Sequence, residues 1–347
     1  MTHRDCESYS ETRVGAVTRF DCAGVRVYQV PVQNLDHYFT NTYLVLDGTT
    51  VSLIDVGFHG EKPVEDFMAG LGAVNRDFGE DIGPGDVAHI VVTHGHDDHF
   101  GMLSCDALKG RPLYMALPDS LVVADYAGED RKWRESCSRM ISEAGCSLAP
   151  DGLFPGIEFA VRPGDYDLVT VADGERIING YGVVGTPGHT PGHICLRVGP
   201  VLFLGDHILS VTSPHQTPRT SWGGAGLAVY LESLRKAAAL GVALGLPGHE
   251  DTIYSVRDRA EEIERFHRAR LAELEELCRG RQSLYDLTGA YYGRHPELIG
   301  ASSIGALEDG ELVMALEEIK AHLEYLVDEG RLVSRSGRDG VVTYGSC

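Results

Sequence analysis

The sequence predicts a mixed α/β protein, and two observations support this fold class. Before residue 256, short β-type runs alternate with helical stretches, and several of the runs end in histidine or aspartate. From Val256 onward, long charged helical stretches and a final hairpin replace this alternation. Because the apolar faces of sheets must be covered, we expect a layered α/β domain over 1–255 and a small α+β unit over 256–347.

The expected strands are short runs rich in β-branched and aromatic residues. They occupy 25–30, 42–48, 51–55, 90–92, 114–115, 158–161, 183–184, 195–198, 201–204 and 242–246. Asp47-Gly48, between the second and third runs, is typical of a hairpin turn. Helices are expected at 61–72 and 227–240, where they can cover the outer faces of the sheets.

The segment 119–147 is predicted to be an inserted helical segment, because the sheets do not need so long a connection. It carries Trp133, Met140 and Ile141 among charged residues. Two roles stay open for it. It is either an elaboration of the surface or a lid over a neighbouring active site, since long insertions beside active sites often act as lids.

The C-terminal part is predicted to be helical with a hairpin at its end. A long charged helix is expected at 256–279, followed by helices near 283–292 and 311–328 with apolar residues at helical spacing. The hairpin is expected at 331–344, around Gly337 and Gly340. Helices followed by a two-stranded hairpin suggest a winged-helix-like domain.

Composition limits the partners and the location of the protein. With 30 basic and 51 acidic residues, the formal net charge is −21, which disfavours a nucleic-acid partner. The eight cysteines show no paired spacing, which is typical of reduced thiols and a cytoplasmic protein. The N-terminus shows no secretory pattern, and no run is as apolar as a membrane helix must be. We therefore expect a cytoplasmic protein that does not associate with membranes.

The densest group of chemically active side chains is the run from His94 to His99. It places three histidines and two aspartates within six residues, directly after an apolar stretch. Without a metal, these side chains would repel one another when protonated and leave polar groups unpaired when neutral. Zinc and similar ions prefer imidazole and carboxylate ligands. The run therefore predicts a metal site at the end of a strand.

Three more candidate ligands lie far downstream: His189, Asp206 and His249. Each follows an apolar run and lies beside glycine, which lets the backbone crowd a metal without a steric clash. A single histidine in such a place is more often structural. The context that the three share favours a common metal site instead.

Taken together, these motifs resemble the metallo-β-lactamase superfamily. The resemblance rests on the H-x-H-x-D-H run, Thr-Pro-Gly-His before His189, Gly-Asp at Asp206, Pro-Gly-His at His249 and the early Asp55. The motifs occur in the family's order, and the match extends from residue 25 to about residue 255. The resemblance implies an αββα sandwich with two metal ions at one edge.

The resemblance also implies how the ligands divide between the ions. The first ion would be held by three histidines: His94, His96 and His189. The second would be held by three other residues: Asp98, His99 and His249. Asp206 would bridge the two ions, and Asp55 would orient a ligand histidine. This ligand set suits two zinc ions but also tolerates iron or manganese.

The implied reaction is hydrolysis by a hydroxide held between the two cations. Asp98 is expected to orient that hydroxide and to accept a proton, which makes it the candidate catalytic residue. His193 is expected to support the ligands from just outside them. Four further residues are candidates for contact with a substrate: His207, His215, Arg219 and Trp222.

The choice among hydrolases depends on Asp206, on charge and on the C-terminal part. β-Lactamases of similar motif commonly carry cysteine at the position of Asp206, so a true β-lactamase is disfavoured. The C-terminal part resembles the lactamase-β-like protein 2 group, which includes an RNA-cleaving member and acyl-carrier-protein thioesterases. A small-molecule thioester or ester hydrolase is preferred, because a thiolate leaves without a dedicated general acid. A metal-dependent endoribonuclease and a hydrolase of lactones or other small molecules are the alternatives.

The C-terminal part also weighs against a non-enzymatic regulator that binds nucleic acid. Residues 280–347 contain eleven acidic and six basic residues, whereas a nucleic-acid-binding wing needs a basic face. Packing or the formation of a homodimer is therefore the preferred role for this part of the chain.

Overall fold

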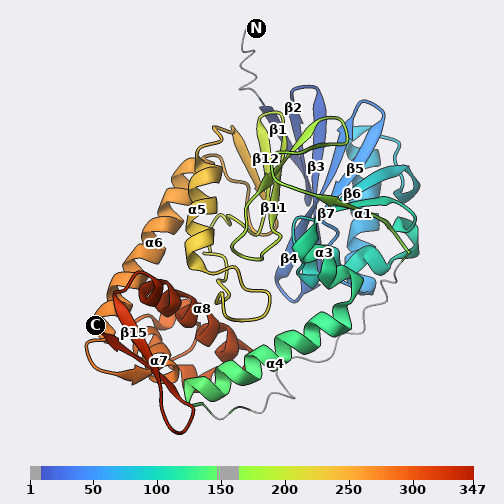
Figure 1. The fold of residues 1–347 in the computed structure, drawn as a ribbon. Coiled ribbons are helices and arrows are strands. Elements are labelled where there is room, and N and C mark those ends of the chain that lie inside the picture. The colour runs from blue at the N-terminus through green and yellow to red at the C-terminus, as the bar shows by residue number, and fades with distance from the viewer. Residues whose placement is uncertain (1–8, 147, 149–163) are drawn as a thin grey trace.

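The protein is a sandwich of two β-sheets with helices on both outer sides, as Figure 1 shows. The computed structural model describes residues 9–146, 148 and 164–347. The expected strand at 158–161 lies outside these described residues. Within them, the layers confirm the αββα sandwich that the sequence predicts.

The first sheet has eight strands that lie side by side in chain order. They are β1 (Tyr9–Val14), β2 (Val17–Cys22), β3 (Val25–Leu35), β4 (Tyr38–Asp47), β5 (Thr50–Ile54), β6 (Val87–Val91), β7 (Pro112–Ala116) and β8 (Asp167–Val171). The pairs from β1 to β5 are antiparallel, and the pairs from β5 to β8 are parallel. Asp47-Gly48 forms the expected turn between β4 and β5, with Gly48 at a φ of 63°.

Helix α1 (Glu61–Phe78) covers the outer face of the first sheet. Its Phe67, Leu71 and Val74 are buried in one cluster with side chains of β3 to β6. The helix is six residues longer than the expected 61–72. It ends where Gly79 takes the left-handed conformation, at a φ of 76°, and its N–H donates to the carbonyl oxygen of Asn75.

The second sheet has five strands in the order β13-β12-β11-β10-β9. They are β9 (Arg176–Ile177), β10 (Tyr181–Gly185), β11 (Ile194–Val198), β12 (Val201–Gly205) and β13 (Leu244–Pro247). Helices α5 (Leu227–Ala238) and α6 (Val256–Leu277) cover its outer face. Between the two sheets, side chains such as Val45 and Ile54 meet Leu196 and Phe203 in a separate buried cluster.

The segment 119–147 is helical over its described residues, as expected. It contains most of α3 (Leu117–Ala124) and all of α4 (Tyr126–Ala144). Figure 1 shows α4 running from the sandwich to the C-terminal elements. Its Cys137, Met140 and Ile141 are buried in the same cluster as α5 and the C-terminal helices. Helix α4 is therefore anchored at its far end, and a role as a lid stays a prediction.

The C-terminal part contains α6, α7 (Leu284–Arg294) and α8 (Asp309–Asp328), beside a small sheet. The order in this sheet is β14 (Gln282–Ser283), β16 (Val342–Ser346) and β15 (Leu332–Ser336). Residues 256–347 share one continuous hydrophobic cluster with α4 and α5. A winged-helix identity and a domain boundary at residue 255 stay predictions.

Short helical turns complete the description of the secondary structure. They are α2 (Asp97–Phe100), η1 (Pro84–Asp86), η2 (Gly101–Ser104), η3 (Asp106–Leu108), η5 (Pro296–Leu298) and η6 (Ile304–Ala306). Within the described ranges, no helix is both long enough and apolar enough to cross a membrane.

Candidate metal centre

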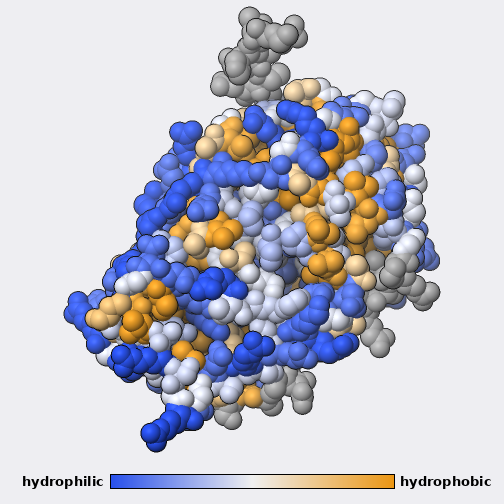
Figure 2. All heavy atoms as spheres, viewed as in Figure 1, coloured by the Kyte–Doolittle hydropathy of each residue, from blue (hydrophilic) through white to orange (hydrophobic). Residues whose placement is uncertain are grey.

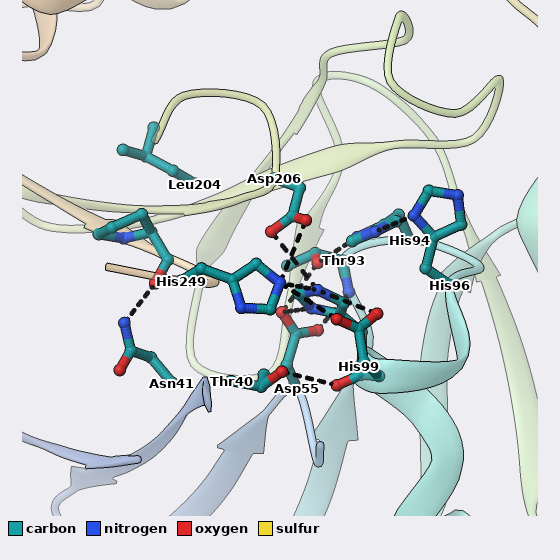
Figure 3. A network of polar contacts seen from close by, with 12 residues as sticks. Thr40, Asn41, Asp55, Thr93, His94, His96, His99, Leu204, Asp206 and His249 are labelled. Atoms are coloured by element: carbon teal, nitrogen blue, oxygen red, sulfur yellow. Dashed lines mark hydrogen bonds and ion pairs between the residues drawn. The ribbon is translucent and has the colours of Figure 1, made fainter. Parts of the chain in front are cut away.

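Strand ends from both sheets bring the seven expected ligands to one edge of the sandwich. Figure 3 shows His94, His96, His99, Asp206 and His249 at this edge. The first sheet supplies the loop after β6 and the short helix α2. The second sheet supplies the loops after β10, β12 and β13. The residues concerned are His94, His96, Asp98, His99, His189, Asp206 and His249. The folded chain thus gathers residues that lie up to 155 positions apart in the sequence.

Three histidines form the first group of facing nitrogen atoms. His94 Nε2 lies 3.1 Å from His96 Nδ1, and His189 Nε2 lies 2.9 Å from the same atom. The three atoms are all within 4.8 Å of one another. The two loops that carry them come from different sheets, so only the closed sandwich brings them together.

A second group lies beside the first and contains two histidines and a carboxylate. His99 Nε2 and His249 Nε2 are 3.2 Å apart, and Asp98 Oδ2 is 3.2 Å from His249 Nε2. Asp206 reaches both groups: Oδ1 lies 3.4 Å from His99 Nε2, and Oδ2 lies 3.7 Å from His189 Nε2. A carboxylate in this position can contact two ions at once.

The hydrogen-bond pattern of the second group fits a bound cation. His99 Nδ1 donates to Asp55 Oδ2 at 2.9 Å, and His249 Nδ1 donates to the carbonyl oxygen of Phe39 at 2.6 Å. In the neutral rings the two Nε2 atoms therefore carry lone pairs, and these face each other. Asp206 Oδ1 is buried and accepts no hydrogen bond from the described residues. A divalent cation would satisfy all three atoms.

The histidine pKa values shift in opposite directions in the two ligand groups. Burial lowers the pKa of His249, but the carboxylates of Asp206 and Asp98 outweigh it and raise the pKa to about 10. The pKa of His99 is also raised, because the same carboxylates overcome its burial. In the first group, burial and the neighbouring His189 lower the pKa of His96 to about 3. The carboxylates therefore make the surroundings of the second group more favourable to positive charge than those of the first.

Asp55 and His193 lie just outside the ligand groups, where the sequence predicts them. Besides holding His99, Asp55 accepts hydrogen bonds from the backbone N–H and the hydroxyl of Thr93, at 2.8 and 2.9 Å. His193 Nε2 accepts the backbone N–H of Asp206 at 3.2 Å. Each residue thus fixes the position of an expected ligand, although its functional role stays a prediction.

The site opens into a cavity of about 1630 Å³. The walls come from the β3–β4 hairpin, from α3 and α4, from the loop after β12 and from α8. His96, Asp98, His189, Asp206 and His249 all reach its surface. On the face shown in Figure 2, hydrophobic residues gather over α3, next to this opening.

Of the four expected substrate contacts, two line the cavity and two do not. His215 and Trp222 are among the lining residues. His207 is fully buried beneath the site and packs against Tyr230. Arg219 extends to the outer surface, where it pairs with Asp328 through hydrogen bonds of 2.8 and 2.7 Å. His207 and Arg219 therefore do not line the cavity, because one side chain is buried in the core and the other pairs with α8; their contact with a substrate stays a prediction.

Tyr38, which no sequence motif indicates, touches the second ligand group. Its hydroxyl lies 2.9 Å from His249 Nε2 and donates to Asp98 Oδ2 at 3.2 Å. Its ring also stacks on His249, with the ring centres 4.6 Å apart. The sequence gives no signal for this contact, because the β3–β4 hairpin lies far along the chain from both partners.

Asp119, the first residue of the predicted insertion, is a second residue at the site that no sequence motif indicates. Its side chain is buried and joins the two loops that carry the first group. Oδ2 accepts the backbone N–H of Gly95 at 2.8 Å and the hydroxyl of Thr190 at 2.5 Å. Oδ1 accepts the backbone N–H of Gly192 at 2.6 Å. Asp119 therefore holds the His94–His96 loop against the His189 loop.

Comparisons with known proteins agree with this geometry. The chain is 27% identical over 258 residues to the "Atrochrysone carboxyl ACP thioesterase" of Aspergillus fumigatus, covering 72% of this chain but only 64% of that protein. It is 27% identical over 249 residues to the "Beta-lactamase-like protein 2 homolog" of Drosophila melanogaster, covering 69% of this chain and 68% of that one.

Among solved structures, a metallo-beta-lactamase family protein of Thermus thermophilus is 25% identical, with a TM-score of 0.71. That similarity covers 92% of this chain and 98% of the other. The family model described as "Metallo-beta-lactamase superfamily" matches residues 35–104 and 121–249, which is more than half of the chain. The chain therefore belongs to the metallo-β-lactamase superfamily.

Proposed function

We propose that the protein is a hydrolase that uses two metal ions and acts on a small-molecule thioester or ester. The observation that carries this proposal is the pair of ligand groups joined by Asp206 and open to one cavity. Both groups contain only imidazole nitrogen and carboxylate oxygen, a donor set that suits zinc and also accepts iron or manganese.

The proposed ligands follow the two groups. One ion would be held by His94, His96 and His189. The other would be held by Asp98, His99 and His249. Asp206 would contact both ions. When bound, two such cations lower the pKa of a water between them and polarise the carbonyl oxygen of the substrate.

The residues of the chain have the following roles in this proposal. Burial raises the pKa of Asp98, but His99 and His249 outweigh it and lower the pKa to about 2, so the carboxylate is ionised at neutral pH. Asp98 is therefore present as a carboxylate that can bind a cation and orient a water through Oδ2, the atom that Tyr38 also reaches. Asp55 keeps His99 oriented with Nε2 toward the site.

Two considerations support a thioester or ester as the substrate. One fungal relative is named an ACP thioesterase, and another relative, from Emericella nidulans, is named "Thioesterase pkgB". A thiolate is also a good leaving group, so the reaction needs little help from a general acid. RNA cleavage is disfavoured, because the formal net charge of −21 would repel a phosphate backbone.

The test is a comparison of substrates with metal-loaded protein. Acyl thioesters and esters are assayed beside a labelled single-stranded RNA, with a chelator-treated sample as reference. We expect metal-dependent hydrolysis of thioesters or esters and no RNA cleavage. Metal-dependent RNA cleavage without thioester or ester hydrolysis would contradict the proposal.

A pair of variants tests the role of the carboxylate between the two groups. Asp206→Ala should abolish turnover and lower the number of metal ions bound per chain, as measured by elemental analysis. Asp106→Ala removes an exposed carboxylate outside the site and should change neither. Turnover retained in Asp206→Ala would refute the mechanism with two metal ions.

A further inference from the structure

Four large apolar side chains lie exposed in the wall of the cavity. Phe39 of β4, Leu121 of α3, Trp222 of the loop after β12 and Met314 of α8 are each between 44% and 53% exposed and all line it. Single exposed apolar residues are ordinary on a protein surface, but a contiguous group marks a binding site. Here four separate segments each contribute one such side chain to the lining of the same cavity.

This apolar wall is continuous with the candidate metal centre. Trp133 of α4 lines the same cavity, and so do the ligand candidates His96 and Asp98. A substrate whose carbonyl group lies at the metal centre would therefore have its neighbouring atoms against apolar and aromatic side chains. We assign the wall to the acyl chain, because this is the hydrocarbon side of the reacting carbonyl, whereas the other side begins with the sulfur or oxygen of the leaving group.

The charged residues of the cavity oppose an anionic substrate. Among the described lining residues, only Arg13 and Arg134 are arginine or lysine. Arg134 is already paired with Asp130, at 2.8 Å. Glu250 and Asp251 lie on the same lining, and Glu250 accepts hydrogen bonds from neutral donors, among them the backbone N–H of Val211 at 2.5 Å. Phosphate groups are normally bound by arginine, lysine or helix N-termini.

From these two features we propose that the site takes an uncharged substrate with a bulky apolar acyl group. The leaving group would be a small neutral thiol or alcohol rather than a phosphorylated carrier such as coenzyme A. This inference rests on the proposed hydrolase function and narrows its substrate class. For a thioester, water adds to the acyl carbon, the C–S bond breaks, and a carboxylate, a proton and the free thiol are released.

The chain contains its own probes for binding at this site. It has two tryptophans, Trp133 and Trp222, and both line the cavity. Intrinsic fluorescence of the metal-loaded full chain therefore reports on a ligand in the cavity. Suitable ligands are S-(2-oxopropyl) and S-(2-oxooctyl) thioethers, which resemble thioesters but cannot be hydrolysed. Each is made on N-acetylcysteamine, which is neutral, and on coenzyme A, which is anionic.

We expect the longer neutral thioether to bind best. It has five more methylenes than the shorter one, and full burial of each raises affinity by up to about fourfold. An increase of about tenfold or more between the two is the expected result. The coenzyme A thioethers should bind several-fold more weakly at low salt, and the difference should shrink at high salt because screening weakens the repulsion.

Two variants test the apolar wall and the charge separately. Leu121→Asp should weaken binding of the 2-oxooctyl ligand about tenfold and leave the 2-oxopropyl ligand unchanged. Leu298→Asp is the matched control, because Leu298 is similarly exposed but does not line the cavity. Asp251→Lys should raise the affinity for the coenzyme A thioethers and leave that for the neutral ones unchanged.

The results separate this inference from the proposed function. Equal affinity for short and long acyl analogues, tighter binding of coenzyme A at every salt concentration, or no fluorescence response to any ligand would overturn the inference. The expected order of binding without metal-dependent hydrolysis of the matching heptanoyl thioester would overturn the proposed function and leave the binding preference standing.

Discussion

Asp119 provides a strong test of how the candidate metal centre is held together. Its carboxylate is the shared acceptor of three hydrogen bonds between the loop that contains Gly95 and the loop that contains Thr190 and Gly192. Asp119→Asn keeps the shape of the side chain but replaces one oxygen with an NH₂ group. This group would face a donor, so at least one buried N–H or hydroxyl would lose its acceptor.

The cost of this change follows from the three hydrogen bonds. A buried donor without an acceptor costs about 1–3 kcal/mol, and the remaining bonds lose the negative charge that strengthens them. We therefore expect Asp119→Asn to lower the free energy of unfolding by about 2–4 kcal/mol. For a chain of this size, that corresponds to a fall in Tm of about 3–6 °C.

The variant should also affect metal binding in an uneven way. Asp119 positions the loops of His94, His96 and His189 and does not touch His99 or His249, so the first ion should bind about 10–100-fold more weakly. The second ion should bind almost as before. Stability is measured by thermal unfolding of metal-free protein, and affinity by competition with a chromophoric chelator.

Thr190→Val gives a graded comparison, because it removes only one of the three hydrogen bonds. Its loss of stability should be smaller, about 1 kcal/mol. An unchanged Tm together with full affinity for two ions in Asp119→Asn would refute the idea that Asp119 joins the two loops.

Three further predictions follow from the contacts around the site. Asp55→Asn removes the carboxylate that holds His99 Nδ1 and should weaken binding of the second ion about 10–100-fold, as measured by chelator competition; unchanged affinity would contradict the role of Asp55. Arg219→Ala breaks an exposed ion pair and should change stability by no more than about 1 kcal/mol, with kcat and KM unaltered; a large rise in KM would support Arg219 as a substrate contact. The pKa of His249 is raised to about 10, well above the ordinary 6.5, so the metal-free protein keeps a proton there that an ion must displace. Metal affinity should therefore increase as pH rises from 7 to 9, by up to about tenfold per pH unit for each proton displaced, and an affinity independent of pH over this range would refute the assignment.

Much of the architecture could be predicted from local patterns. Apolar runs with β-branched residues indicated most of the strands in the two central sheets, and helical spacing indicated α5, α6 and α8 to within a few residues. The patterns failed where strands are short or exposed. β1 has five exposed residues out of six, and β9 has only two residues, so neither shows the alternation that marks a half-buried strand.

The sequence by itself determined which residues could bind metal, because histidine and aspartate beside glycine at the ends of apolar runs have few other uses in such density. It could not determine which residues support them. Tyr38 and Asp119 touch the site only because the β3–β4 hairpin and the start of α3 fold against its loops.

The tertiary structure also separated His215 and Trp222, which line the cavity, from His207 and Arg219, which do not. These four residues lie within one stretch of sixteen, so their spacing in the sequence carried no information about direction. The direction of each side chain was decided by contacts with α4, α5 or α8, and such contacts join residues far apart in the chain.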